Sequence, residues 1–300
     1  MPKVLSTIRL PGPAWDELDD VEVVPELTEP RADAEVLIVP NQTVDARVLD
    51  LLPSLKLVAN FSVGYDRIDL DACRARGVAV TNTPGVLDAA TADLAFALIL
   101  AARRRVVEGD RHVRAGDWAG GWFTGPFLGL EVSGTTLGIV GLGRIGSAVA
   151  RRARGFDMRV LFSQRTRIET ELGDYRELDD LLRESDVVSI HAPLSAETTG
   201  MIDARCLALL RDGATFVNTS RGGLVDEDAL VRELISGRIS AGLDVFVQEP
   251  DVPRELFELP NVVLTPHVGS ATVETRAAMA RIVVDNVLAY FGGDPLPSPV

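Results

Sequence analysis

Three charged side chains follow predicted strands in the last third of the chain. Arg221 follows the segment ATFVNTS, Glu249 lies five residues after Asp244 at the end of another strand, and His267 follows NVVLTP. Because ligands of open α/β sheets bind beyond the carboxyl ends of the strands, we expect these side chains to gather at one edge. The chain has only three histidines. An arginine beside a histidine and a carboxylate indicates carboxylate binding together with proton transfer.

A glycine motif upstream supplies a second constellation. The segment LGIVGLGRIGSAVA places Gly141, Gly143 and Gly146 in G-x-G-x-x-G spacing, between an apolar strand pattern and a helix pattern. This context is typical of a dinucleotide-binding turn. The first glycine permits the tight turn, the second lets pyrophosphate approach the backbone, and the third lets the helix pack on the strand. The free N–H groups of the helix N-terminus would bind the phosphates, so we interpret the charged cluster as a site of hydride transfer.

The segment VLFSQRTR indicates which dinucleotide is used. Ser163 lies about 20 residues after Gly141, where NAD-binding chains carry an acid for the adenosine ribose. A serine does not repel a 2′-phosphate, and Arg165 can bind that phosphate through its planar guanidinium. Arg167 either assists or is a solvated charge. We therefore predict NADP(H) as the preferred cofactor, with NAD(H) as the alternative.

Composition restricts the other classes of function. The chain has 300 residues, 46% of them hydrophobic, and a net charge of −14, which disfavours binding to a nucleic-acid backbone. Its most apolar run, from Leu94 to Ala102, is far shorter than the roughly 20 residues of a membrane span. Cys73 and Cys206 are far apart and have no metal-binding spacing. We expect a cytoplasmic protein without a metal, a membrane or a nucleic acid as partner.

Strand patterns alternate with helix patterns almost throughout, which predicts an α/β fold with two doubly wound parallel sheets. A helix pattern from Asp88 to Val107 and another from about Ala271 onward would cross between the domains. We predict a discontinuous first domain of residues 1–93 and 276–300, and a second of residues 94–275. Predicted strands of the two domains cover residues 3–10, 21–27, 34–40, 55–64 and 77–84, then 135–141, 159–163, 186–191, 214–220, 240–246 and 261–266.

These motifs occur together in one known family. NFSVGYDRIDLDACRARGVAVTNTPG, GLGRIG, HAPLSAETTGMI, NTSRGGLVDEDAL, GLDVFVQEP and LTPHVGS follow one another in its order. The chain resembles the D-isomer-specific 2-hydroxyacid dehydrogenases over nearly its whole length. Within them, SQRTR and GDWAGGWF are most similar to the glyoxylate/hydroxypyruvate reductase branch. The resemblance implies a flavodoxin-like substrate domain, a Rossmann dinucleotide domain, and reduction of small 2-oxo acids to 2-hydroxy acids.

The resemblance also implies roles for single residues. Arg221 would hold the substrate carboxylate and carbonyl. His267 would be the general acid in reduction and the base in oxidation, and Glu249 would hydrogen-bond to it. The backbone N–H groups of Val63 and Gly64 would bind the carboxylate from the other domain, with substrate in the interdomain cleft.

The implied cofactor contacts come from the strand ends of the second domain. Asp244 would face the nicotinamide carboxamide, and Pro193 would line the cofactor. The full predicted set is Gly141, Leu142, Gly143, Arg144, Ile145, Gly146, Ser163, Gln164, Arg165, Thr166, His191, Ala192, Pro193, Thr198, Thr219, Ser220, Arg221, Asp244, His267 and Gly269.

A homodimer is expected from the apolar helix between Leu94 and Ala102 and from the tryptophan-rich loop after it, because both are too apolar for a monomer's surface. The resembling branch forms dimers through this region, with a loop tryptophan reaching the neighbour's active site. Trp122 is our choice for that residue and for substrate contact, with Trp118 as the second choice.

Several alternatives remain open. A phosphoglycerate dehydrogenase would need a cation where this chain has Asn41 and Gln42, and a phosphite dehydrogenase carries a lysine at the position of Val63. A formate dehydrogenase pairs its histidine with glutamine, whereas this chain has Glu249. A rival of another class is a dinucleotide-sensing corepressor built on the same fold. Turnover of 2-oxo acids would separate this binding protein from an enzyme.

Overall fold

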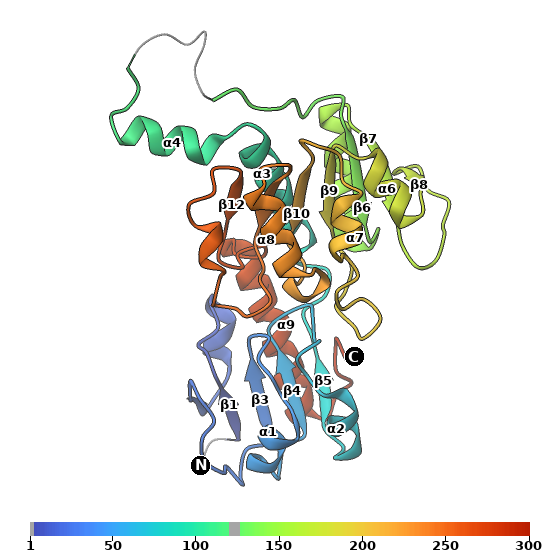
Figure 1. Cartoon of the computed structure of the whole chain (residues 1–300). Coiled ribbons are helices and arrows are strands. Elements are labelled where there is room, and N and C mark those ends of the chain that lie inside the picture. Colours follow the sequence, from blue (N-terminus) through green and yellow to red (C-terminus); the bar gives the residue numbers. More distant parts are fainter. Residues whose placement is uncertain (1–2, 120–126) are drawn as a thin grey trace. The chain divides into compact units, whose positions relative to one another are not determined.

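Short runs of Val, Ile and Leu form the strands of two parallel sheets in the computed structural model, which describes residues 3–119 and 127–300 (Figure 1). The chain divides into two units, residues 1–87 with 270–300 and residues 88–269. The predicted limits at 93/94 and 275/276 fall inside helices. The units instead contain whole helices, because each long helix packs against the elements of one unit. The units are described separately below.

The first unit contains a five-stranded parallel sheet in the order β2-β1-β3-β4-β5. β3 and β4 are buried along their whole length, as expected for parallel strands covered on both faces. Helix α9 packs on β4, and Figure 1 shows it along this sheet. The strands are β1 Val4–Ser6, β2 Val21–Val23, β3 Val36–Val39, β4 Leu57–Asn60 and β5 Ala79–Thr81; the helices are α1 Ala46–Leu51, α2 Leu70–Ala75 and α9 Val273–Gly292.

The second unit contains a seven-stranded parallel sheet in the order β12-β11-β10-β9-β6-β7-β8. All six predicted strands are present, and the two-residue edge strand β8 is additional. Its strands are β6 Thr136–Val140, β7 Arg159–Ser163, β8 Asp174–Tyr175, β9 Val187–Ile190, β10 Thr215–Asn218, β11 Ser240–Leu243 and β12 Val262–Leu264. Its helices are α3 Asp88–Arg103, α4 Val106–Arg114, α5 Arg144–Ala153, α6 Leu178–Glu184, α7 Ala204–Ala208 and α8 Glu227–Ile235. The predicted fold class, two parallel-sheet α/β domains, is confirmed.

Side-chain caps start many of the helices where the sequence has an acid or a threonine. The carboxylate of Asp203 accepts a hydrogen bond from Cys206 N at 2.8 Å, and that of Asp226 accepts one from Ala229 N at 2.9 Å. Thr272 caps α9 in the same way. Each cap satisfies one N–H group that the helix itself leaves without a partner.

The predicted helix from Asp88 to Val107 is two helices. Arg105 adopts a left-handed conformation, with φ of 54°, which ends α3 and redirects the chain into α4. The apolar run from Leu94 to Ala102 is largely buried, as predicted: Phe96, Leu98 and Ile99 are at most 5% exposed, because α3 packs on β10, β11 and α5. Leu94 and Leu100 are half-buried.

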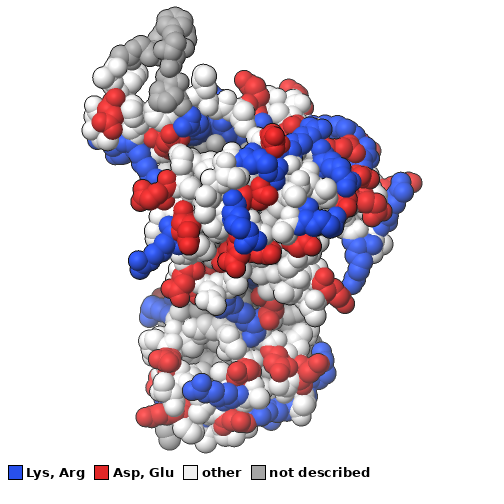
Figure 2. All heavy atoms as spheres, in the orientation of Figure 1, with Lys and Arg blue, Asp and Glu red and all other residues white. Residues whose placement is uncertain are grey.

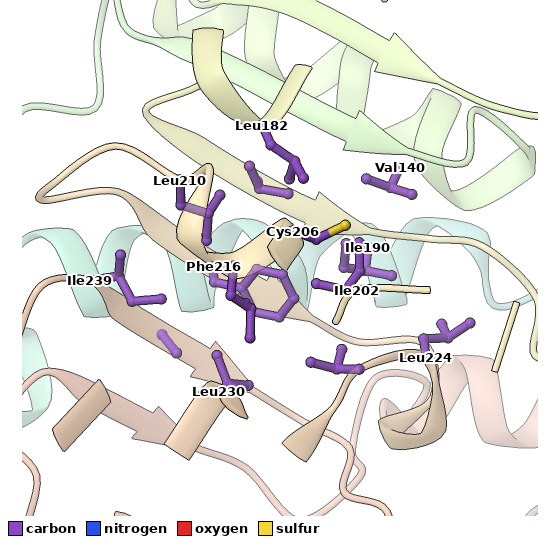
Figure 3. Close-up of a cluster of buried hydrophobic side chains, with 14 of the residues drawn as sticks. Val140, Leu182, Ile190, Ile202, Cys206, Leu210, Phe216, Leu224, Leu230 and Ile239 are labelled. Atoms are coloured by element: carbon purple, nitrogen blue, oxygen red, sulfur yellow. The ribbon is translucent and has the colours of Figure 1, made fainter. Parts of the chain in front are cut away.

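Helices α6, α7 and α8 of the second unit pack over a separate cluster of buried apolar side chains (Figure 3). Phe216 of β10 and Leu182 of α6 belong to it, and both are fully buried. Cys206 lies among these side chains, and burial raises the pKa of its thiol. This core fixes β9 and β10, whose carboxyl ends carry predicted site residues.

The surface of the second unit is covered by alternating charges. Arg205 bonds to Asp179 at 2.7 Å, and Arg176 bonds to Glu184 at 2.9 Å. On the face that Figure 2 shows, basic and acidic side chains are interleaved rather than gathered by sign. Within the described residues, no helix is long and apolar enough to cross a membrane.

Candidate active site

The glycine turn lies at the carboxyl end of β6, and its glycines are required by close backbone contacts. Gly141 has φ of 97°, and a Cβ there would lie 2.8 Å from the backbone of His191. A Cβ on Gly146 would lie 2.1 Å from the carbonyl oxygen of Gly141. Gly143, the N-cap of α5, has no neighbouring atom within 4 Å of the position of a Cβ. The turn is thus tight on its inner side and open at the helix N-terminus, which fits a bound pyrophosphate.

Ser163 is the last residue of β7 and lies directly beside this turn. Its carbonyl accepts a hydrogen bond from Gly141 N at 2.8 Å, and its side chain is buried. Arg165 is almost fully exposed, with its guanidinium 3.9 Å from Glu197. Arg167 instead lies over the ring of Tyr175, 5.3 Å from its centroid. Both arginines are thus exposed; Arg167 contacts a ring, whereas Arg165 makes one long ion pair.

The carboxyl ends of β9 and β10 supply the next side of the predicted cofactor site. His191 Nε2 lies 2.8 Å from Ser189 Oγ, and burial lowers the pKa of His191 to about 4, so its imidazole is neutral at pH 7. Ser220 Oγ donates to Ala192 O at 2.6 Å and so joins the two strand ends. The hydroxyl of Thr219 is buried without a partner among the described residues. Such an orphan group in a predicted cofactor wall fits a polar ligand.

Two further segments belong to the same predicted wall. Thr198 Oγ1 donates to Pro193 O at 2.7 Å and closes the loop after β9. Gln164 Nε2 donates to Thr166 O at 2.8 Å and closes the loop after β7. These contacts fix backbone that the sequence assigned to cofactor binding.

His267 and Glu249 form the pair that the sequence predicted. Nδ1 of His267 lies 2.7 Å from Oε2 of Glu249, and the other carboxylate oxygen accepts from Phe246 N at 3.1 Å. The carboxylate is an acceptor, so the Nδ1–H donates, and Nε2 is the ring nitrogen left for a ligand. His267 has φ of 51°, a conformation that histidine tolerates better than most residues.

Asp244 holds the backbone of the histidine loop, a role that the sequence did not reveal. It is fully buried, and Oδ1 accepts from Thr265 Oγ1 at 2.6 Å and from Val268 N at 2.8 Å. Oδ2 accepts from Gly269 N at 2.8 Å. Burial raises the pKa of Asp244, and these hydrogen bonds oppose the rise.

Arg221 begins the turn after β10, and a glycine brings that turn against the loop of Glu249. Asn218 Nδ2 donates to Arg221 O at 2.9 Å, and Arg221 Nη1 donates to Ser220 O at 2.8 Å. A Cβ on Gly222 would lie 2.0 Å from the carbonyl carbon of Phe246. Backbone contact therefore connects the arginine turn to the loop that carries the acid.

In the first unit, Val63 and Gly64 occupy the loop after β4. Their carbonyl oxygens accept hydrogen bonds from Asn82 and Asn60, whereas their N–H groups donate to no other group of the described chain. Sequence reasoning missed both asparagines, although polar residues at the ends of buried strands were a usable signal.

The predicted substrate contact Trp122 lies outside the described residues. Trp118 is described and is 68% exposed. No group of His, Cys, Asp and Glu side chains that could hold a metal ion is found in residues 3–119 and 127–300.

Known proteins share this arrangement. Residues 96–269 match the model of the D-isomer specific 2-hydroxyacid dehydrogenase NAD-binding domain. A glyoxylate reductase of Thermococcus litoralis is 50% identical over 276 residues, which are 89% of this chain and 83% of that protein. A glyoxylate reductase of Korarchaeum cryptofilum is 52% identical, covering 86% of this chain and 79% of that one.

Solved structures agree. An NADPH-dependent glyoxylate/hydroxypyruvate reductase from Sinorhizobium meliloti, in complex with NADP and malonate, superposes with a TM-score of 0.91 at 36% identity and covers 100% of this chain and 96% of that one. The residues of the glycine turn fit a dinucleotide, and the family model covers more than half of the chain. The chain therefore belongs to the D-isomer-specific 2-hydroxyacid dehydrogenases and is an oxidoreductase that uses a nicotinamide dinucleotide.

Proposed function

We propose that this protein reduces glyoxylate and hydroxypyruvate to the corresponding 2-hydroxy acids with NADPH. The observation that carries the proposal is the pair of His267 and Glu249 at 2.7 Å, in a chain about half identical to named glyoxylate reductases. A histidine paired to a half-buried acid, at the same edge of the sheet as the glycine turn, suits a proton donor for a carbonyl that accepts hydride.

The site residues divide the tasks of this reaction. A dihydronicotinamide held at the strand ends would supply the hydride. Arg221 binds the substrate carboxylate and draws electron density toward the carbonyl oxygen. His267 donates its Nε2 proton to the developing alkoxide, and Glu249 stabilises the imidazolium through Nδ1. Val63 and Gly64 N–H groups hold the carboxylate.

The NADPH preference rests on residues 163–165. Ser163 has no charge to repel a 2′-phosphate, and the exposed guanidinium of Arg165 pairs with Glu197 only at 3.9 Å. A phosphate would therefore compete well for Arg165, because a bidentate contact with a dianion is stronger than this long surface pair. NAD(H) is the alternative cofactor.

We further propose a homodimer formed through α4 and residues 127–130. Val106 and Val113 on α4 are each 55% exposed, and Leu128 is 82% exposed. His112 contacts the ring of Phe127, so these side chains belong to one region. Trp122 would contribute to the partner's site. We place the protein in the cytoplasm, where its cysteines, both free here, remain reduced.

The test is a panel of 2-oxo acids with NADPH and with NADH, followed at 340 nm. We expect turnover of glyoxylate and hydroxypyruvate, and its loss in His267→Ala with NADPH binding retained. Preference for a phosphorylated substrate or for phosphite would assign the chain to another member of the family. Cofactor binding without turnover of any substrate would favour the dinucleotide-sensing corepressor and refute the proposed reaction.

A further inference from the structure

The loop of residues 62–64 in the first unit is held by its carbonyl groups. Ser62 O accepts from Thr83 N at 3.0 Å, and Val63 O accepts from Asn82 Nδ2 at 2.8 Å. Gly64 O accepts from Asn60 Nδ2 at 2.8 Å. Three consecutive carbonyl groups of the loop are thus bound by the last residue of β4 and by the two residues that follow β5 after Thr81.

These bonds set the direction of the N–H groups. In a planar trans peptide the C=O and the following N–H point in opposite directions. The bond from Thr83 N to Ser62 O therefore directs the Val63 N–H away from β5, and the bond from Asn82 to Val63 O does the same for the Gly64 N–H. Both N–H groups remain without an acceptor in the described chain, as an anion-binding loop requires.

Asn82 is itself held by the C-terminal tail. Its N–H donates to Ser298 O at 3.2 Å, and its carbonyl accepts from Ser298 Oγ at 2.6 Å. Asn286 of α9 donates to Ser298 Oγ at 2.9 Å and accepts from Ser298 N at 3.2 Å. Asn286 is fully buried, Asn82 is 8% exposed and Ser298 is half-buried, so these hydrogen bonds are partly shielded from water.

We propose that Asn82, fixed by Ser298 and Asn286, is a positioning residue that aims the Gly64 N–H at the substrate carboxylate. The inference rests on the proposed function, because it assigns the loop to carboxylate binding. It gives the last residues of the chain a part in substrate affinity: Val300 N pairs with Val80 O, and Ser298 connects this edge of β5 to the loop.

The test compares Asn82→Ala with Asn261→Ala. Asn261 is a matched control because its Nδ2 also binds backbone carbonyls, those of Leu234 and Ile239, within the second unit. We expect Asn82→Ala to raise KM for glyoxylate roughly 2- to 13-fold, the value of one neutral hydrogen bond, with kcat and NADPH affinity little changed. The Kd of the unreactive analogue oxamate should rise equally, and Asn261→Ala should lower Tm without moving KM.

Ser298→Ala is the second variant, since it keeps the Asn82 side chain but removes the hydrogen bonds that Ser298 Oγ makes with Asn82 O and with Asn286. A rise in KM that is smaller than the rise in Asn82→Ala would support the role of Ser298 in holding Asn82. Unchanged KM and oxamate affinity in Asn82→Ala would overturn the assignment, as would an equal rise in Asn261→Ala. If the wild-type protein reduces no 2-oxo acid, the proposed function fails. That result is distinct from an active wild type whose KM is insensitive to Asn82.

Discussion

At the scale of single residues, the chemistry depends on how one carboxylate acts on one imidazole. Glu249 uses one oxygen for His267 and the other for the backbone N–H of Phe246, so its position is fixed from two sides. A fixed anion next to Nδ1 stabilises the charged imidazolium relative to the neutral ring. Reduction needs the imidazolium as proton donor, and oxidation needs the neutral ring as base.

We expect Glu249→Gln to lower kcat/KM for reduction and for oxidation, because a neutral amide accepts the Nδ1–H less strongly than the carboxylate does and leaves the imidazole ring less firmly oriented. The measurement is kcat/KM in both directions. His267→Ala is the control and should lower kcat by about 10²–10⁴-fold, the usual value of a general acid. Unchanged kcat/KM in both directions would show that Glu249 does not position the histidine.

The cofactor prediction also belongs to a single residue. Arg165→Ala should weaken NADPH binding by roughly 10–150-fold, the value of one hydrogen bond to a charged group, and should spare NADH. Arg167→Ala is the matched control, because that guanidinium lies over Tyr175 and should affect NADPH less. The measurement is the dissociation constant of NADPH and of NADH, obtained by titrating each variant with each cofactor. Equal losses for both cofactors in Arg165→Ala would refute the assigned role.

At the scale of elements, the site depends on loops that touch through their backbones. The turn after β10 carries Arg221, and the loop after β11 carries Glu249. The absence of a side chain on Gly222 lets the turn approach Phe246. Because catalytic geometry tolerates little displacement, small shifts of these loops should change rate before they change stability.

We therefore expect Gly222→Ala to lower kcat/KM by at least about 10-fold, since its Cβ would lie 2.0 Å from backbone of the acid's loop. Gly223→Ala is a neighbouring control whose Cβ would make an ordinary contact with Leu194 at 3.4 Å. Kinetics and Tm measured on both variants provide the comparison. Similar activity in the two variants would mean that the close approach does not position the site.

At the scale of the whole molecule, the prediction concerns the oligomeric state. Most of the large apolar residues of α3 are buried or half-buried inside the second unit, whereas α4 and residues 127–130 offer exposed apolar side chains. Exposed apolar patches of this kind mark interaction surfaces.

Light scattering should give about twice the chain mass of 32.3 kDa for the wild type. Leu128→Glu should shift the protein toward the monomer, because a charge would be buried in the interface. Val273→Glu is the control, since Val273 is 84% exposed but lies on α9 of the first unit. A wild-type monomer with full activity would rule out both the dimer and a role of Trp122 in a partner's site.

The sequence by itself determined the two sheets and the glycine turn, and it singled out Glu249 and His267 after strand ends; their pairing was implied by the family resemblance. These features depend on local signals: apolar runs for buried strands, glycines where a Cβ would clash, and polar residues at strand ends. It also placed Ser163 at the ribose-binding position, because its distance from Gly141 along the chain is close to that of the acid in NAD-binding chains.

Only the tertiary structure decided which groups meet across long distances in the chain. The break at Arg105 depends on the packing of α3 against the second sheet. The role of Asp244 depends on N–H groups more than twenty residues away. The link from Asn286 through Ser298 to Asn82 joins residues about two hundred positions apart. Such hydrogen bonds carry no local periodicity, so they can be recognised only after the sheets have brought their strand ends together.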